Sequence, residues 1–156
     1  MKKIILASAI LGIFSVSASA SKGDEAPAAV KASFTKLYPN VAKVKWEKEG
    51  ANYEAEFDLN KQETSCLFDA GGNLLETETE IAISDLPKSV SDYVAKNYSG
   101  QKISEASKIV DSKKITVYEA EIKEGDLIFD DKGIFIKKIV APKGEKEDDD
   151  EKDEKK

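Results

Sequence analysis

The sequence predicts an α+β protein built from two tandem units, in which each unit is one helix followed by four strands of an antiparallel sheet. Three observations predict this fold class: a proline precedes an amphipathic helical pattern twice, apolar and polar residues then alternate with period two, and short motifs of the first half recur in the second. Because a unit of this size buries little apolar surface alone, we expect the units to pack together as one continuous sheet, covered by the helices on one face.

The internal repeat is carried by three pairs of motifs. Pro27 recurs as Pro87, Tyr53-Glu54-Ala55-Glu56-Phe57 recurs as Tyr118-Glu119-Ala120-Glu121-Ile122, and Phe68-Asp69-x-x-Gly72 recurs as Phe129-Asp130-x-x-Gly133. The distance between the copies changes only at predicted turns, where folded proteins tolerate insertions. We therefore predict one domain over residues 27–141, with repeat 1 over 27–83 and repeat 2 over 86–141.

Each unit opens with a helix. Proline is favoured in the first helical turn, where its missing N–H needs no partner. The apolar residues that follow it fall on one helical stripe: Val30, Phe34, Leu37 and Tyr38 in the first unit, and Val90, Tyr93, Val94 and Tyr98 in the second. Pro39-Asn40 and Ser99-Gly100 then end the two helices.

Four strands follow each helix. Alternation predicts them around Val44–Glu47, Tyr53–Phe57, Cys66–Phe68 and Leu74–Ile81, and then around Ile103–Val110, Ile115–Ile122, Asp126–Phe129 and Ile134–Val140. Turns separate them, and Gly71-Gly72 and Gly133 are interpreted as turn residues because no phosphate-binding spacing surrounds them. Ile81 and Ile83 continue the alternation almost to Leu86, which predicts an ordered, half-buried link between the units.

Both ends of the chain differ from this domain. Residues 1–20 have the pattern of a cleaved signal peptide, with two lysines, an apolar run too short to span a bilayer, and a small-x-small site ending at Ala20. Residues 21–26 form a polar leader. Residues 142–156 are almost entirely Lys, Asp and Glu, and we expect this acidic tail to be disordered because it has no apolar side chain to bury. We therefore expect a periplasmic or secreted protein, cleaved after Ala20, with no stable membrane insertion.

Composition excludes several functions. The chain contains no histidine and no arginine, which removes Ser-His and Cys-His nucleophile pairs, His-ligated zinc and bidentate arginine clamps. Without residues 1–20, 22 lysines face 30 acidic residues, a net charge of −8. This charge disfavours nucleic acids and anionic membranes. We expect no enzymatic activity, no catalytic residue, no cofactor and no metal site.

Two single residues have both a functional and a structural interpretation. Cys66 is the one cysteine, so no intrachain disulfide can form, and its place in an alternating strand favours a buried apolar side chain over a reactive thiol. Trp46 is the one tryptophan and alternates with charged residues. We predict that it packs in the core rather than anchoring an interface.

The motifs as a set resemble a known family. Val44-Lys-Trp46, Tyr53-Glu-Ala-Glu-Phe57, Phe68-Asp-x-x-Gly72 and Leu86-Pro87-x-x-Val90 are similar to those of the PepSY-like, beta-lactamase-inhibitor-like family of exported proteins, common in Bacteroidota. The resemblance covers about residues 26–140. It implies tandem helix-and-four-strand units, and the family's name records a likeness to inhibitors that dock a concave sheet surface against a target enzyme. The matched positions are core and turn residues, so the resemblance maps no inhibitory contact.

Glu54, Glu56, Glu119 and Glu121 recur on the polar side of the predicted sheet. We predict a solvated acidic face there, with docking of a basic partner as an alternative interpretation. The predicted function is an exported binding module that contacts another envelope protein, as an inhibitor or modulator of an envelope enzyme, through this face. Two other interpretations stay open: a periplasmic sensor or carrier for a small ligand or cation, and a hydrolase that uses carboxylates alone.

Overall fold

The structure, a computed structural model, describes residues 26–140 of the 156-residue chain. The predicted signal peptide at 1–20, the predicted leader up to residue 25 and the predicted tail at 142–156 lie outside the described residues. Within the described range, no helix is long and apolar enough to cross a membrane.

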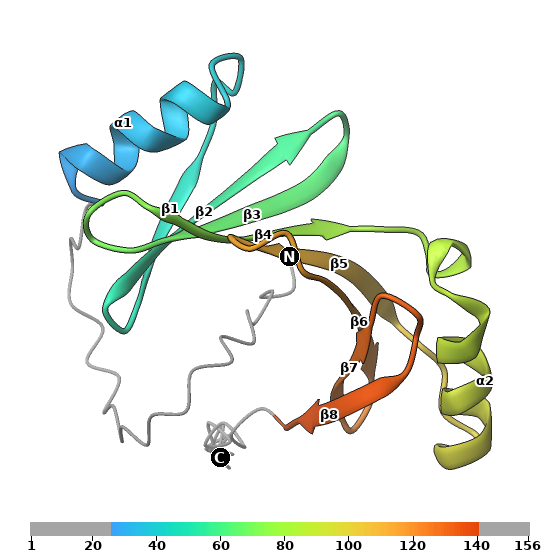
Figure 1. Cartoon of the computed structure of the whole chain (residues 1–156). Helices are drawn as coiled ribbons and strands as arrows, with labels where there is room; N and C mark the ends of the chain where they lie inside the picture. Colours follow the sequence, from blue (N-terminus) through green and yellow to red (C-terminus); the bar gives the residue numbers. More distant parts are fainter. Residues whose placement is uncertain (1–25, 141–156) are drawn as a thin grey trace, which may run out of the picture.

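Between residues 26 and 140 the chain forms the helix-and-four-strand arrangement twice (Figure 1). The first unit contains α1 (Ala28–Leu37), β1 (Lys45–Glu49), β2 (Asn52–Leu59), β3 (Gln62–Phe68) and β4 (Leu74–Glu80). The second contains α2 (Lys88–Asn97), β5 (Glu105–Asp111), β6 (Thr116–Ile122), β7 (Gly125–Asp130) and β8 (Phe135–Ile139), and a short 3-10 helix, η1 (Ile83–Asp85), links the two. The eight strands of the described range join one antiparallel sheet in the order β1 to β8. The predicted fold class and the predicted continuous sheet are confirmed.

Both helices start directly after a proline. Pro27 and Pro87 precede α1 and α2, and their carbonyl oxygens accept hydrogen bonds from the first helical turn at 3.0 and 2.9 Å. The helices bury the middle of the predicted stripes, namely Val30 and Phe34 in α1 and Val90 and Val94 in α2. Leu37 departs from the predicted stripe: it is the last residue of α1 and is 49% exposed.

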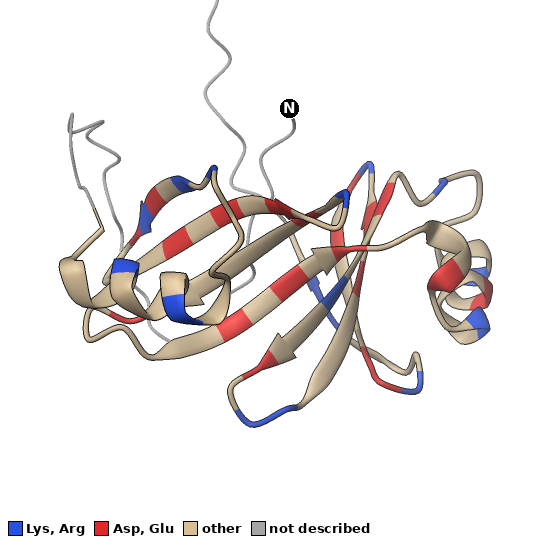
Figure 2. Cartoon of the chain, turned by 90° about the horizontal axis from the view of Figure 1, so that it is seen from above, with Lys and Arg blue, Asp and Glu red and all other residues tan. Residues whose placement is uncertain are grey.

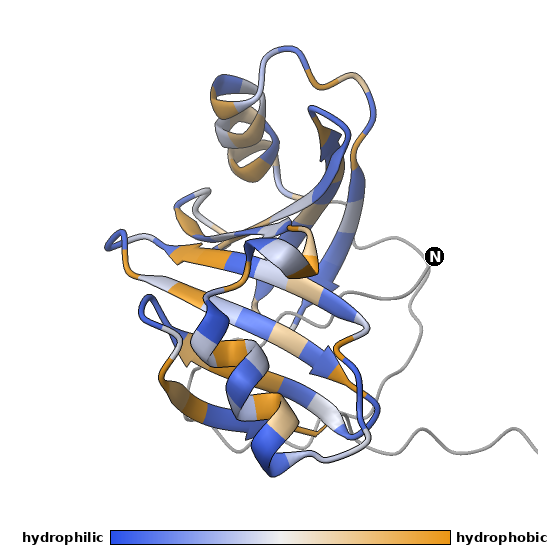
Figure 3. Cartoon of the chain, turned by 90° about the vertical axis from the view of Figure 1, so that its right-hand side faces the viewer, coloured by the Kyte–Doolittle hydropathy of each residue, from blue (hydrophilic) through white to orange (hydrophobic). Residues whose placement is uncertain are grey.

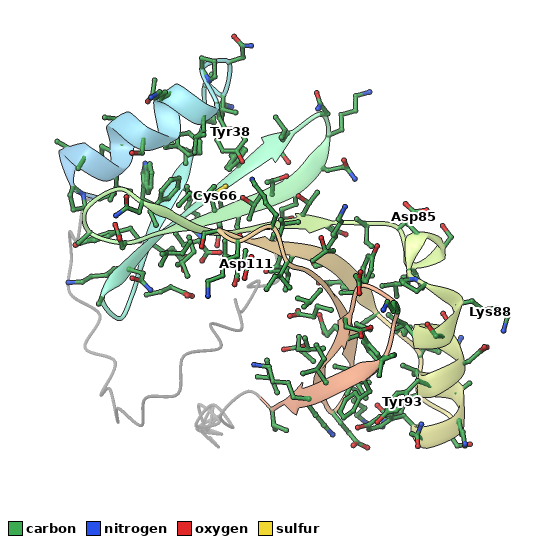
Figure 4. All side chains as sticks on the ribbon, in the orientation of Figure 1. Tyr38, Cys66, Asp85, Lys88, Tyr93 and Asp111 are labelled. Atoms are coloured by element: carbon green, nitrogen blue, oxygen red, sulfur yellow. The ribbon has the colours of Figure 1, made fainter. Side chains whose placement is uncertain are left out.

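Each unit has its own hydrophobic core between its helix and its half of the sheet. The first core consists of Ala26, Val30, Phe34, Ala55, Phe57, Cys66 and Phe68, and the second of Leu86, Val90, Val94, Ala106, Ala120, Ile122, Leu127 and Phe129. Trp46 packs against the first core with its ring centroid 5.4 Å from that of Phe34, which confirms its predicted role. Cys66 is buried as predicted, and its thiol lies 3.3 Å from the hydroxyl of Tyr38, the residue that follows α1 (Figure 4).

The repeated Phe-Asp-x-x-Gly motif builds the turns that follow β3 and β7. In the second copy, Phe129 is fully buried in the core, and Asp130 Oδ1 accepts hydrogen bonds from two backbone N–H groups of the turn at 3.0 and 2.8 Å. Gly133 has a φ of +75°, and a Cβ there would collide with the side chain of Ser89 at the start of α2. The motif therefore lets the turn approach the beginning of the helix closely.

The link between the units differs in part from the prediction. β4 ends at Glu80, but Ile81 N still donates a hydrogen bond to Ala106 O at 2.9 Å, and Ile81 packs against the second core. Ile83 lies in η1 and is 41% exposed. The prediction of an ordered, half-buried link is confirmed for Ile81 and wrong for Ile83, because the chain turns there to begin α2.

The sheet is strongly bent, and the helices lie outside the bend. Figure 1 shows α1 over the β1–β3 end of the sheet and α2 beside the β6–β8 end, both on the convex side. Figure 3 shows α2 lying across the strands of its own half. The opposite face is concave, and no helix of residues 26–140 covers it.

Candidate binding face

The concave face, defined as the face of the sheet opposite α1 and α2, is set by the strand register. Glu54 pairs with Leu67, Leu67 with Glu76, and Glu76 with Asp111 across β2 to β5, so these side chains share that face. The same register adds the carboxylates Glu47, Glu49, Glu56, Glu78, Glu119, Glu121 and Asp126, and the lysines Lys45 and Lys137. Figure 2 shows the acidic bands along the strands. The concave face is therefore strongly acidic.

A row of five buried polar side chains crosses the middle of the concave face, and we call it the buried row. It consists of Glu54 on β2, Ser65 on β3, Glu78 on β4, Ser107 on β5 and Glu119 on β6, which are 0, 0, 1, 8 and 8% exposed. Ser65 pairs with Glu78 and Ser107 pairs with Glu119. In the described part of the chain, neither carboxylate oxygen of Glu54 or of Glu78 has a hydrogen-bond partner in good geometry. The nearby hydroxyls of Ser65 and Ser107 lower the pKa of Glu54 and of Glu78 respectively, and so offset part of the effect of burial. The row joins both units.

Burial holds the carboxyl groups of this row protonated up to about neutral pH. Desolvation raises the pKa of Glu54 to about 8, of Glu78 to about 7 and of Glu119 to about 9. Neighbouring carboxylates raise these pKa values further, because each added negative charge opposes ionisation. The concave face therefore carries less charge at neutral pH than its count of acidic residues indicates.

The four acidic residues predicted to form the face lie on it in two pairs. Glu54 and Glu56 come from β2, and Glu119 and Glu121 come from β6, so three strands separate the pairs. Glu54 and Glu119 belong to the buried row, while Glu56 and Glu121 are half-buried beside it. The predicted solvated acidic face is wrong at its centre, because alternation shows which residues share a face but not how far the sheet curves around them.

Three carboxylates at the β1–β2 end of the concave face are close enough to share a cation. Glu47, Glu54 and Glu56 each offer one oxygen, and the three oxygens lie within 4.8 Å of one another. Lys45 Nζ already lies 2.5 Å from Glu47 Oε1 and 2.7 Å from Glu56 Oε2. The ammonium group of Lys45 therefore already pairs with Glu47 and Glu56, whereas Glu54 does not pair with it.

A small apolar hollow lies on the same face at the other end, and sequence reasoning missed it. We call it the isoleucine hollow: its volume is about 190 Å³, and its lining is Ile109, Ile115, Val117, Ile128 and Ile136, with Glu76, Asp111 and Lys137 around them. Ile115 and Ile136 are 57 and 52% exposed. Figure 4 shows Asp111 on the side of the sheet away from Tyr38 and Tyr93. The sequence pattern indicates only that these isoleucines belong to strands, because their position beside Glu76 depends on the β4–β5 pairing.

The concave face also bears on the alternative of a hydrolase that uses carboxylates alone. Such an enzyme needs two carboxyl groups at suitable separation in a cleft, one of them desolvated. The buried row provides desolvated carboxyl groups, contrary to the open face expected from the sequence. Its members are spread over five strands and both units, which is the arrangement of an extended surface.

Fold, duplication and a concave face that no helix of residues 26–140 covers together define a class of small tandem-repeat sheet proteins. A family model described as "Putative beta-lactamase-inhibitor-like, PepSY-like" matches residues 19–76 and, a second time, residues 58–137. The chain belongs to this PepSY-like family, as the resemblance in its motifs implied.

Solved structures with the same fold come from Bacteroides species. A protein from Bacteroides eggerthii described as a putative periplasmic protein superposes with a TM-score of 0.68 at 18% identity, covering 74% of this chain and 89% of its own. A DUF2874 family protein from Bacteroides uniformis gives 0.67 at 23% identity, covering 74 and 90%. A BLIP-like protein from Bacteroides fragilis gives 0.62 at 26% identity, covering 78 and 91%. A comparison with curated proteins finds no match.

Proposed function

We propose that this protein is an exported, non-enzymatic binding module that docks another protein of the bacterial envelope on its concave face. The observation that carries the proposal is the buried row. Burying the carboxyl groups of Glu54 and Glu78 costs stability, because each loses its water and has only a neighbouring serine hydroxyl in place of it. Neutral or apolar side chains would stabilise the sheet better, and departures from this rule concentrate at functional sites.

The shape of the face and the comparisons support the same proposal. Both helices lie on the convex side, which leaves the concave face open to a partner (Figure 1). One structural neighbour is described as periplasmic and another as BLIP-like. The finer form of the proposal is that the docked protein is an envelope enzyme, which this chain inhibits or modulates.

Site-specific cross-linking in cells tests the proposal. A photoreactive phenylalanine analogue is placed at Ile136 on the concave face or, as the control, at Leu37 on the helix side, since both side chains are about half exposed. We expect a discrete adduct from position 136 and none from position 37. Equal cross-linking from both positions, or none from position 136, would contradict docking on the concave face.

Cation sensing or transport is the second candidate function. Glu54 supports it, because one oxygen of this buried carboxyl group lies within 4.8 Å of a carboxylate oxygen of Glu47 and of Glu56. Lys45 weakens it, because a cation would have to compete with the ammonium group already bound to Glu47 and Glu56. Calorimetric titration of calcium into the wild-type chain and into the Glu54→Gln variant tests this candidate function. Binding to the wild type that the variant loses would support cation sensing. The absence of binding heat in both proteins would contradict it.

A further inference from the structure

The isoleucine hollow has the size and lining of a binding pocket for one side chain. Small-molecule sites usually enclose roughly 300–1,000 Å³, whereas this hollow has a volume of about 190 Å³. Ile115 and Ile136 leave more than half of their side chains in water at its mouth. Covering them with an apolar side chain of a partner would therefore be favourable, because burial removes apolar surface from water.

The charges beside the hollow determine which partner fits. Glu76 and Asp111 are direct cross-strand neighbours, an unfavourable pairing of like charges. Burial, followed by the proximity of Asp111, raises the pKa of Glu76, and its Oε1 has no hydrogen-bond partner in the described range. Asp111 Oδ1 is held in the β5–β6 turn by the backbone N–H groups of Lys113 and Ile115, both at 2.8 Å. Lys137 also borders the hollow, and its charge lowers the pKa of Glu76. Two carboxyl groups beside one lysine still leave an excess of negative charge, which favours a positively charged group from a partner.

Other occupants fit the charge less well. The chain's own C-terminal segment, residues 143–156, contains five lysines and eight acidic residues, so its net charge of −3 opposes this face. The concave face of a second copy carries the same excess of carboxylates, so two such faces repel each other. Anionic ligands are repelled for the same reason.

We infer that the isoleucine hollow seats one aliphatic or aromatic side chain from a lysine- or arginine-rich segment of a protein partner, whose cationic groups lie against Glu76 and Asp111. This inference rests on the proposed function and adds the chemistry of the partner to it. The apolar side chain supplies the anchor, and the flanking cations select the partner by charge.

A peptide-binding experiment tests this chemistry. The chain without its predicted signal peptide is titrated against a short labelled peptide with one leucine among lysines and glycines, and fluorescence anisotropy is measured in about 50 mM salt. We expect saturable binding. Replacing the leucine by serine, or acetylating the lysines, should each weaken the affinity by about fivefold or more, the loss that one small buried contact produces.

Matched variants separate the hollow from general attraction to an acidic protein. Ile136→Ser and Glu76→Gln should weaken binding of the leucine-lysine peptide by about fivefold each. Ile134→Ser and Asp92→Asn are the controls, because both side chains are exposed and neither lines the hollow. The controls should leave the affinity unchanged.

Three results would overturn the inference. The first is no saturable binding of the peptide, and the second is equal binding by all four variants. The third is self-association of the wild-type chain, measured by light scattering, that Ile136→Ser abolishes, since the occupant would then be a second copy. The two proposals can be contradicted separately. If position 136 gives a cross-link in cells but the peptide does not bind, docking on the concave face still holds, and only the inference of a basic partner is contradicted.

Discussion

Replacing Glu78 by glutamine should change how the stability of the protein depends on pH. Glu78 lies in the middle of β4, where it pairs with Ser65 on β3 and with Ile109 on β5 at the boundary between the units. It is 1% exposed, and desolvation raises its pKa from 4.5 to about 7. Glutamine keeps the shape of the side chain and removes the ionisation.

The sign follows from which state binds the proton more tightly. Because the folded-state pKa of Glu78 is raised, the folded protein holds the proton between pH 4.5 and about 7 while the unfolded chain releases it. The stabilising effect of this difference is complete below pH 4.5 and is lost as the pH rises through about 7. A pKa raised from 4.5 to about 7 corresponds to about 3 kcal/mol of unfolding free energy. The Glu78→Gln variant should escape that loss.

Urea unfolding followed by Trp46 fluorescence and by circular dichroism, at several values from about pH 4 to about pH 8, measures the effect. The stability of Glu78→Gln relative to wild type should rise by about 3 kcal/mol across this range. Asp92→Asn, which removes the charge of an exposed carboxylate on α2, is the control for the loss of one negative charge. Parallel curves for wild type and Glu78→Gln would refute the reasoning, because Glu78 would then titrate as it does in the unfolded chain.

Three further predictions concern the fold. Gly133→Ala should destabilise the protein more than Gly50→Ala, because both positions have positive φ but only the former Cβ would collide with the start of α2; chemical denaturation of the two variants compares them. Cys66 should not react with a thiol reagent in the folded protein and should react on unfolding, because it is fully buried and burial raises its pKa; fast reaction of native protein would contradict this. The two halves, expressed separately with the break between Ser84 and Asp85, should each lose cooperative unfolding, because β4 and β5 would no longer pair with each other. A sharp calorimetric transition in either half alone would contradict this expectation.

Much of the fold could be predicted from sequence because its signals are local. Pro27 and Pro87 indicate the helix starts, and period-2 alternation indicates the strands and the residues that face the helices. The errors in the predicted burial lie at the ends of elements, where the local pattern of apolar residues continues. Leu37 keeps the helical spacing and Ile83 keeps the strand spacing, yet both are substantially exposed because the chain turns at these points.

The candidate site could be predicted only in part, because it depends on pairing between strands. Alternation was sufficient to place Glu54 and Glu119 on one face with their neighbours. Their burial depends on the curvature of the whole sheet, and the isoleucine hollow requires Glu76 of the first unit to meet residues of the second unit. A single sequence contains no local signal for such a register, and polar residues in alternation are normally interpreted as solvent-exposed.

The separation of the two hydrophobic cores has a mechanical consequence. The β4–β5 ladder joins two halves that each pack against their own helix, so a load between the halves passes through the backbone pairing of these two strands. Glu76 belongs to one half, and the apolar lining of the hollow belongs to the other. A partner bound there would contact both halves and so bridge this ladder.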